Sequence, residues 1–328
     1  MALTVSVALC TWNGERFVKD QLRSILGQTV RPVQLVVSDD GSTDGTVDLV
    51  TATIADWRIA NPGAQLEVVR IQNAVTLGVT ANFAGAIAAT TGDLVALCDQ
   101  DDVWPPSRLE RLVSEFASRP NLLLLHTDAA LIDASGHPTG ESLFDSLGVT
   151  AAITSAVHAG NAFEVLMKRN IVTGATTIFR QRVADLAAPF PSAWVHDEWL
   201  AIVAAMLDGV DLLEEKLLGY RQHGANEIGV ERLGIAGKVR RMLEPGAERN
   251  QRLLARAKQL AERISALSTT AARTAAVGEK LAHEQVRSGL GRRRLARVMP
   301  VIRELGTGRY RAFGRGTADA VRDLLQPL

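Results

Sequence analysis

The sequence predicts an α/β fold in which a mostly parallel central sheet is flanked by helices and followed by a helical C-terminal extension. Apolar, β-branched runs of strand length alternate with segments of helical periodicity from residue 4 to about residue 230. This alternation is typical of parallel sheets covered on both faces. From about residue 235 the sequence becomes rich in Ala and Arg. We therefore expect one domain at residues 1–234 and a basic, mainly helical extension at residues 235–328.

The period of the apolar residues predicts the elements of the first domain. Residues 4–10, TVSVALC, predict a strand, and Phe17, Leu22, Ile25 and Leu26 lie on one face of the helix after it. Further strands are expected at residues 34–38, 66–71, 95–98, 122–128 and 130–133, and further helices at 46–59, within 73–92, at 108–120, at 158–170 and from His196 onward. Residues 170–180 predict a strand pair or one strand kinked at a glycine.

The extension shows a clear amphipathic pattern from residue 248 to residue 278, with basic residues opposite the apolar face. A second helix is expected at residues 279–298, with Gly278 and Gly289 or Gly291 as possible breaks. Neither a sequence repeat nor a low-complexity tract interrupts the chain.

The composition limits the class of protein. The chain has 328 residues, of which 47% are hydrophobic and 22% charged, and this excludes disorder as the main state. No apolar run approaches the roughly 20 residues that span a bilayer, and the first residues lack a basic leader, so we expect a cytoplasmic protein. Cys10 and Cys98 lie in apolar segments without a CxxC spacing, and we expect neither a zinc site nor a disulfide.

The formal net charge of zero conceals two oppositely charged regions. Residues 235–328 hold 20 Lys and Arg against 8 Asp and Glu, whereas the preceding residues hold 16 basic and 28 acidic groups. The extension lacks a nucleic-acid motif, so we expect no nucleic-acid partner. An anionic membrane surface, bound peripherally, is one expected partner. The acidic domain, in the same chain or across a homodimer, is the other.

Polar clusters follow three of the expected strands, at residues 11–15, 39–45 and 99–102. In parallel sheets, ligands bind beyond the carboxyl ends of the strands, so we expect these clusters to meet. Asp99, Asp101 and Asp102 could bind a hard divalent cation such as Mg²⁺ or Mn²⁺. They could also form a solvated acidic turn in which Asp102 caps the next helix.

Five segments, in chain order, resemble the family 2 glycosyltransferases of the GT-A fold. They are VSVALCTWNGE, VVSDDGSTDGT, CDQDDVW, HDEW and YRQHGAN, and the resemblance covers about residues 4–230. The DQDDVW and YRQHG forms are most similar to a bacterial branch of rhamnosyltransferases. HDEW is the weakest signal, because the family more often has Glu-Asp where this chain has His196-Asp197-Glu198.

The resemblance implies a site for a nucleotide diphospho-sugar donor. Asp40, with Asp39 beside it, would recognise a pyrimidine base, so a dTDP- or UDP-sugar is the implied donor. Asp101 and His223 would bind Mn²⁺ or Mg²⁺. The remaining implied donor-binding residues are Cys10, Thr11, Asn13, Glu15, Asp99, Gln100 and Arg221, with Asp99 near the ribose and Arg221 on a phosphate.

Asp197 matches the base that takes the proton of the acceptor hydroxyl, and Glu198 is the alternative. An acid at a helix N-terminus is also favoured by the helix dipole alone. The implied enzyme is an inverting, metal-dependent transferase that uses dTDP-rhamnose, or alternatively a UDP-sugar. Its implied acceptor is a glycan or lipid-linked glycan of the cell envelope.

Two other functions were weighed. A nucleotidyltransferase would need a Gly-rich, basic phosphate loop, and TWNGE is not one. A catalytically silent binding module would be expected to lose some of the set Asp40, Asp99, Asp101, Asp197 and His223. We expect Trp199 and the histidines at 126, 137, 158 and 283 to be structural or surface residues. Trp12 and Trp104 could shape the sugar pocket or simply pack.

Overall fold

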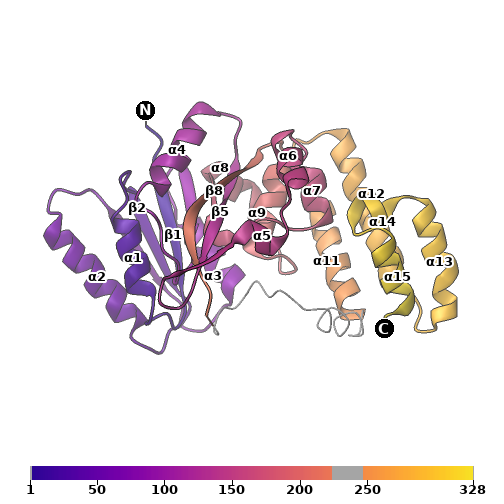
Figure 1. Cartoon of the computed structure of the whole chain (residues 1–328), viewed down its shortest axis with the longest axis horizontal. Coiled ribbons are helices and arrows are strands. Elements are labelled where there is room, and N and C mark those ends of the chain that lie inside the picture. The colour runs from indigo at the N-terminus through magenta and orange to yellow at the C-terminus, as the bar shows by residue number, and fades with distance from the viewer. Residues whose placement is uncertain (1, 224–246, 328) are drawn as a thin grey trace. The chain divides into compact units, whose positions relative to one another are not determined.

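The computed structural model describes residues 2–223 and 247–327, which form two compact units (Figure 1). The first unit contains residues 2–162 and 171–223, and the second contains residues 163–170 and 247–327. The boundary expected at residue 234 lies outside the described residues. Residues 163–170 fall inside the expected first domain, yet they pack with the second unit.

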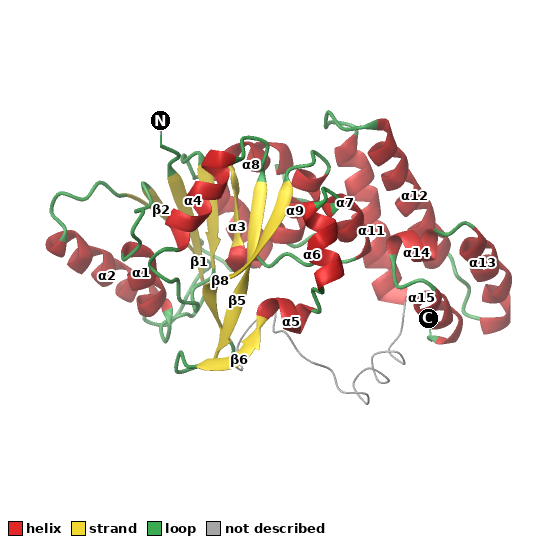
Figure 2. Ribbon diagram, turned by 45° about the horizontal axis from the view of Figure 1, so that its top comes forward, coloured by secondary structure: helices red, strands yellow, loops and turns green. Residues whose placement is uncertain are grey.

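The first unit is built on an eight-stranded sheet with the order β3-β2-β1-β4-β7-β5-β6, in which β8 also pairs with β5 (Figure 2). Strands β3, β2, β1 and β4 are mutually parallel, as are β5 and β8, whereas β7 is antiparallel to β4 and β5, and β6 to β5. The strands are β1 Val5–Thr11, β2 Gln34–Asp39, β3 Glu67–Gln72, β4 Leu94–Cys98, β5 Leu124–Ile132, β6 Pro138–Ser142, β7 Thr177–Arg180 and β8 Val210–Arg221. The α/β fold with a mostly parallel sheet is thus confirmed.

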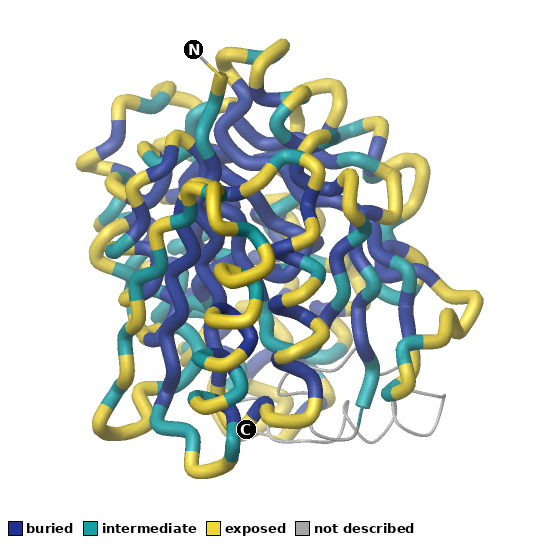
Figure 3. Tube along the Cα trace, turned by 90° about the vertical axis from the view of Figure 1, so that its left-hand side faces the viewer, coloured by how far each residue is buried: buried dark blue, intermediate teal, exposed yellow. Residues whose placement is uncertain are grey.

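Helices cover both faces of this sheet, as the alternation of strands and helices predicted. Those of the first unit are α1 Val18–Leu26, α2 Thr46–Ala60, α3 Val79–Ala88, α4 Arg108–Ser118, α5 Leu143–Leu147, α6 Ala151–His158, α8 Gln181–Ala187 and α9 His196–Ala205. Alternate residues of β1, Val5, Val7 and Leu9, share one apolar core with α1, α2 and α4, while α3 packs on the other side with α9. The central strands β1, β2 and β4 are consequently buried along their whole length, whereas the edge strands β3 and β6 are largely exposed or only partly buried (Figure 3).

The structure corrects two elements of the first unit. The helix expected at 158–170 is shorter, because α6 ends at His158 and α7 (Ala162–Lys168) begins only after Gly160, which has a φ of 83°. A left-handed glycine ends a helix at little steric cost. Residues 170–180 contain one 3₁₀ turn, Gly174–Thr176, and one strand, β7, rather than a strand pair.

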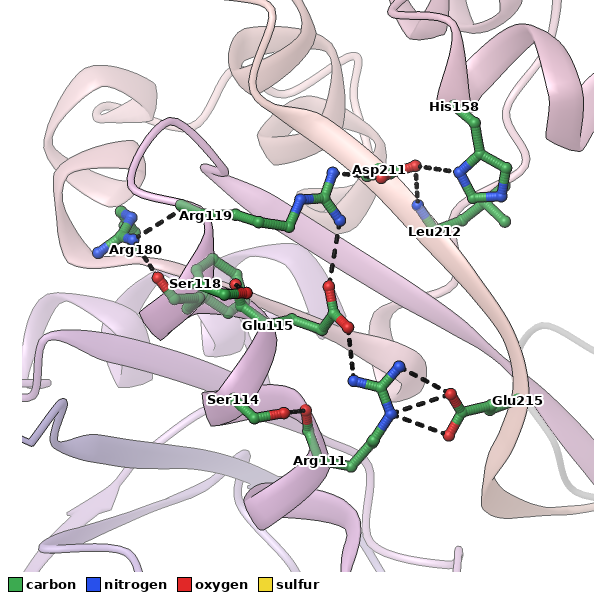
Figure 4. Close-up of polar contacts among 11 residues, drawn as sticks. Arg111, Ser114, Glu115, Ser118, Arg119, His158, Arg180, Asp211, Leu212 and Glu215 are labelled. Carbon is green, nitrogen blue, oxygen red and sulfur yellow. Dashed lines mark hydrogen bonds and ion pairs between the residues drawn. The ribbon is translucent and has the colours of Figure 1, made fainter.

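An ion network on the first unit ties α4 to β8 and α6 (Figure 4). Arg111 contacts Glu115 at 2.5 Å and Glu215 at 2.8 Å, and Arg119 joins Glu115 to Asp211. His158 Nδ1 lies 2.8 Å from Asp211, so the expectation of a structural role for this histidine is confirmed. Exposed ion pairs stabilise little individually, but this network fixes the C-terminal end of α4 against β8.

The second unit consists of α7 and five later helices: α11 Ala247–Ile264, α12 Ala271–Ser288, α13 Arg294–Gly306, α14 Arg309–Phe313 and α15 Thr317–Leu325. The break expected at Gly278 is wrong, because Gly278 lies inside α12 and the chain breaks before Thr270, whose side chain caps α12. A glycine inside a helix costs only about 1 kcal/mol, so a good N-cap decides the boundary. Gly289 ends α12, as expected.

The interior of the second unit is ionic. Arg287 donates to Asp323 at 2.7 and 3.2 Å and to Glu284 at 3.3 Å, and Tyr310 donates to Asp323 at 2.9 Å. His283 Nδ1 lies 2.7 Å from Glu304. We call these six residues, with Arg297, the ionic core. A small apolar cluster of Leu290, Val301, Tyr310, Ala320 and Leu324 accompanies it, and Leu260, Ile264 and Val277 are also buried. No helix within the described residues is long and apolar enough to cross a membrane.

Candidate active site

The three polar clusters that follow strands meet at one edge of the sheet. Thr11 pairs in register with Asp39 across β1 and β2, and Leu9 pairs with Cys98 across β1 and β4. Because β8 runs parallel to β5, its end reaches the same edge, where Gly219 bridges Val103. The expected convergence is therefore confirmed. We call this region the strand-end edge and define it as residues 11–15, 39–46, 99–104 and 219–223.

The loops after β1 and β2 are locked together by side chains that were expected to bind the donor. Asp39 accepts from the Thr11 hydroxyl at 2.8 Å and from the Ser42 hydroxyl at 2.6 Å. Asn13 Oδ1 accepts from the Thr43 amide at 2.9 Å, and Glu15 Oε2 accepts from the Gly45 amide at 3.1 Å. These side chains therefore have a structural role, because they hold the two loops of the strand-end edge together.

Asp40 is buried and holds the loop that precedes α3. Its Oδ1 accepts from the Asn73 side chain at 2.8 Å and from the Leu77 amide at 2.9 Å, and its Oδ2 accepts from the Gly78 amide at 2.8 Å. A buried carboxylate needs such donors, because desolvation would otherwise penalise its charge. The sequence did not reveal this structural role. Recognition of a base by Asp40 stays a prediction.

Gln100 connects the loops after β1 and β4. Its side chain accepts from the Trp12 amide at 2.8 Å and donates to the Trp12 carbonyl at 2.9 Å. The chain at Gly14 passes so close that a Cβ there would lie 2.1 Å from Gln100 Oε1. A side chain at position 14 would therefore displace the Gln100 side chain, and the TWNGE segment alone does not show this constraint.

Asp101 and His223 come together, although 122 positions separate them in sequence. Asp101 Oδ2 lies 2.7 Å from His223 Nε2, and both side chains keep some solvent exposure, 15% and 12% respectively. The His223 ring stacks on Phe17, with the two centroids 4.7 Å apart. The structure therefore pairs the two residues to which the resemblance assigned the metal.

Asp102 does not cap the next helix, and that expectation is wrong. It is fully buried, its Oδ1 accepts from the Arg221 amide at 3.0 Å, and Ser107 occupies the N-cap position of α4. Burial, followed by the charges of Asp101 and Asp99, raises the pKa of Asp102 well above its ordinary value. Pairing between β8 and the loop after β4 draws Asp102 inward, which local sequence cannot show.

Arg221 is directed at protein carbonyls. Its Nε donates to the Asp101 carbonyl at 2.6 Å and its Nη1 to the Ala134 carbonyl at 3.1 Å, while the guanidinium lies 4.9 Å from the Phe17 ring centroid. The side chain is buried. This geometry holds the backbone of Asp101 beside His223.

Asp99 and the two cysteines complete the inner wall of the edge. Asp99 is partly exposed, and the Cys98 thiol donates to its carbonyl at 3.2 Å. Burial, reinforced by the charge of Asp99, raises the pKa of both the Cys10 and the Cys98 thiols. Both cysteines are free, as expected, and they remain neutral packing groups at physiological pH.

Asp197 lies in the first turn of α9 and is held by the backbone. Its Oδ2 accepts from the Gly174 amide at 2.8 Å and its Oδ1 from the Glu198 amide at 2.7 Å. His196 stacks on Phe83 with centroids 4.0 Å apart, and burial lowers the pKa of His196 to about 3. The His196 side chain is consequently neutral, and it is a buried packing residue next to Asp197 in the sequence.

Tyr220 links the two ends of the candidate site. Burial, then the charges of Asp99, Asp102, Asp101 and Asp197 in that order, raises the pKa of its hydroxyl. One phenol therefore lies within the electrostatic field of both the metal-binding candidates and the base candidate. The YRQHG segment contained Tyr220, but nothing in its spacing singled this residue out.

Arg108 supports the base candidate from inside the fold. It is completely buried, and it donates to the Leu217 carbonyl of β8 at 2.8 Å and to the Ala175 carbonyl at 2.9 Å. Ala175 follows Gly174, whose amide binds Asp197. The guanidinium also covers Trp104 at 4.6 Å, so Trp104, which is buried, is a packing residue.

The other aromatic residues behave mostly as expected. Trp199 is buried and donates to the Ala187 carbonyl at 2.8 Å, which confirms its packing role. His126 and His283 are buried, whereas His137 is exposed. Trp12, half-exposed at the strand-end edge, remains a candidate for the sugar pocket.

A comparison with protein families finds a match in part of the first unit. Residues 6–135 match the family model described as Glycosyl transferase family 2. A Nostoc protein named uncharacterized glycosyltransferase alr2836 is 27% identical over 228 residues, which cover 68% of this chain and 66% of that protein. The match spans 66% of the length of the Nostoc protein and 59% of the length of Rv1520 of Mycobacterium tuberculosis, so the chain covers about two-thirds or less of these relatives.

Two solved structures share the fold at low sequence identity. S. aureus TarS 1–349, solved with UDP-GlcNAc, has a TM-score of 0.59 at 14% identity, covering 95% of this chain and 82% of that chain. The mannosyltransferase PcManGT from Pyrobaculum calidifontis, solved with GDP-Man and Mn²⁺, has a TM-score of 0.51 at 17% identity, covering 98% and 79%. Over residues 6–135 the chain is therefore similar to glycosyl transferase family 2, and its α/β unit shares the fold of these two structures, the GT-A fold.

Proposed function

We propose that the chain transfers a sugar from a nucleotide diphospho-sugar to an acceptor hydroxyl, with inversion at the anomeric carbon. The observation that carries this proposal is the 2.7 Å contact between Asp101 and His223 at the strand-end edge. A carboxylate and an imidazole from distant segments meet where α/β sheets bind ligands. After burial, the charges of Asp99, Asp102, Asp101 and Asp197 all raise the pKa of Tyr220.

The donor set fits a divalent cation. Mg²⁺ usually takes one or two carboxylates together with substrate phosphates and waters, and Mn²⁺ also accepts imidazole. The described residues contain no group of three or more His, Cys, Asp or Glu that could hold an ion. Asp101 and His223 would therefore share the ion with the donor diphosphate. When bound, Mn²⁺ or Mg²⁺ would neutralise charge on the leaving group.

Asp197 is proposed as the base of a single displacement. The acceptor oxygen forms a bond to the anomeric carbon as the bond from that carbon to the diphosphate oxygen breaks. The nucleoside diphosphate leaves with the electron pair, and Asp197 takes the proton of the acceptor hydroxyl. One such carboxylate is sufficient, unlike the two required by glycosidases. The backbone amides of Gly174 and Glu198 orient Asp197 for this role.

Arg221 is assigned to positioning rather than to phosphate binding. Its guanidinium donates to the carbonyls of Asp101, Asp133 and Ala134. A guanidinium has five N–H donors in a fixed planar geometry. Three hydrogen bonds of the Arg221 guanidinium go to backbone carbonyls of the loops that surround Asp101. Arg221 therefore fixes the metal-binding candidate.

The proposed donor is dTDP-rhamnose, with a UDP-sugar as the alternative. The preference rests on the similarity of DQDDVW and YRQHG to rhamnosyltransferases. The two structural neighbours were solved with UDP-GlcNAc and GDP-Man, so this fold accommodates different nucleotides. The proposed acceptor is a glycan or a lipid-linked glycan of the cell envelope.

A thermal-shift panel tests the site. We expect dTDP- or UDP-sugars to raise the Tm in the presence of Mn²⁺, and Asp101→Ala to abolish this shift. Asp20→Ala is the matched control, because Asp20 is an exposed carboxylate on α1. An equal shift without Mn²⁺, or in Asp101→Ala, would remove the metal assignment. Binding without any product would indicate a catalytically silent module instead.

A further inference from the structure

Helix α13 of the second unit has the reverse of the usual amphipathic arrangement. Its buried residues are Arg297, Val301 and Glu304. Its exposed residues include five large apolar side chains, which we call the apolar outer face: Leu295 at 89% exposure, Val298 at 37%, Met299 at 56%, Ile302 at 54% and Leu305 at 38%. Their spacing of three and four positions places them along one side of the helix.

Polar contacts fix this orientation. The buried Arg297 donates to the carbonyls of Gly291 and Gln326, each at 2.6 Å, and Glu304 accepts from or donates to His283 at 2.7 Å. Rotating α13 to bury its apolar residues would expose Arg297 and Glu304, and it would break all of these hydrogen bonds. The apolar outer face is therefore a built feature of the unit. Contiguous exposed apolar surface of this kind marks an interaction site.

Within residues 291–327, the exposed charges have one sign. Residues 291–327 contain three acids, Glu304, Asp319 and Asp323, and all three are buried. Six arginines in the same range are exposed, at positions 292, 293, 294, 303, 311 and 315. Three of them immediately precede or begin α13. The exposed surface of this segment is consequently apolar and cationic, with no exposed carboxylate.

We propose that the apolar outer face of α13 docks on an anionic lipid surface. The apolar side chains would enter the boundary between headgroups and acyl chains, and the exposed arginines would contact anionic headgroups. A second copy of this face fits less well, because Glu304, Asp319 and Asp323 are buried and it would offer no carboxylate to the exposed arginines. The proposal uses only the second unit and does not rest on the proposed transfer reaction.

Vesicle co-sedimentation of the full chain tests this proposal. We expect binding to vesicles of phosphatidylcholine and phosphatidylglycerol in equal amounts, much weaker binding to phosphatidylcholine alone, and loss of binding in high salt. Each arginine near an anionic surface changes the partition coefficient by roughly fivefold, so R292Q/R293Q/R294Q should lower it on the order of 100-fold. L295E/I302E should lower it at least about tenfold, because it puts charge into the apolar boundary.

Ile59→Glu is the matched control, since Ile59 is an apolar residue of α2 with 80% exposure in the first unit. It should bind vesicles like the unmodified chain, and thermal unfolding should show that all variants fold. Equal vesicle binding by L295E/I302E and the unmodified chain would overturn the proposal. The proposal would also be overturned if the unmodified chain did not bind phosphatidylglycerol vesicles but formed a dimer, and if L295E/I302E dissociated that dimer. The apolar outer face would then be an interface between copies.

Discussion

The two units of the chain place charge in opposite ways. In the first unit an apolar interior supports a sheet, and the carboxylates Asp99 and Asp101 stand partly exposed at the strand-end edge. In the second unit Glu284, Glu304 and Asp323 lie inside the ionic core, while α13 turns apolar residues outward. A carboxylate at an edge can meet a ligand, whereas one in an ionic core is already neutralised by its partners. Asp99 and Asp101 are the acids that we propose to act, whereas buried acids such as Asp102 and Asp323 hold the fold.

Two buried arginines show the same contrast. Arg108 of the first unit donates to backbone carbonyls, and burial lowers its pKa to about 10. Burial also acts to lower the pKa of Arg287, but the hydrogen bonds and charge of Asp323, with the charge of Glu284, raise it above its ordinary value. The surroundings of a buried guanidinium therefore decide whether its charged form is destabilised or stabilised.

The largest effect should come from the base candidate at the strand-end edge. Asp197→Asn should lower the rate of sugar transfer on the order of 10³-fold, because a positioned base contributes about that much. The thermal shift caused by the donor should persist, since Asp197 is not assigned to donor binding. Product formation by the variant is the measurement. If Glu198→Gln abolishes transfer and Asp197→Asn does not, the base is Glu198.

Breaking the ionic core should affect stability instead of chemistry. Arg287→Met leaves Asp323 and Glu284 buried beside a neutral side chain, which should cost about 3–5 kcal/mol of unfolding free energy. Urea unfolding of the full chain measures this loss. Arg311→Met, at an exposed arginine, is the matched control and should change little.

A charge-free variant of the same cluster sharpens the result. R287M/E284Q/D323N removes the positive charge together with both acids, so it should be more stable than Arg287→Met alone. If this triple variant is the less stable of the two, the arginine stabilises by packing, and the ionic account of this core is wrong.

The apolar interior of the first unit should make the protein sensitive to acid. Burial lowers the pKa of His126 to about 4, whereas an exposed histidine in the unfolded chain titrates near 6.5. The stability that this difference provides is complete above pH 6.5 and is lost as the pH falls toward 4, because the unfolded state binds the proton first. His126 should account for about 2 kcal/mol of the loss between pH 7 and pH 5.

Urea unfolding at both pH values measures that contribution. His126→Phe and His126→Asn should each reduce the loss by the same amount, although their absolute stabilities will differ. An unchanged pH dependence in both variants would show that other groups determine the acid sensitivity.

The smallest effect should come from the close approach at Gly14. Gly14→Ala must displace the Gln100 side chain, because the new Cβ would lie 2.1 Å from its Oε1. The two hydrogen bonds to Trp12 would then be lost, which should cost about 1–2 kcal/mol. Combining Gly14→Ala with Gln100→Ala should cost less than the sum of the single changes. Additive losses would show that the two residues do not compete for space.

Several features of the fold could be predicted because they depend on local periodicity. The apolar run of residues 4–10 and the spacing of Phe17, Leu22 and Ile25 placed β1 and α1 close to their observed bounds. The break in the extension could not be placed, since Gly278 is tolerated inside α12 and Thr270 gave no stronger signal than other polar residues. Periodicity reports which face is apolar, but it does not report where a marginal helix stops.

The sequence alone predicted the fold class and the convergence of the strand-end residues, because strand ends in a parallel sheet converge whatever the details of packing. Only the tertiary structure decided what each charge does. Pairing of β8 with the loop after β4 buried Asp102 and turned Arg221 onto the Asp101 carbonyl. The ionic core likewise fixed which side of α13 faces outward. These outcomes depend on contacts between residues far apart in the chain, and no local pattern encodes them.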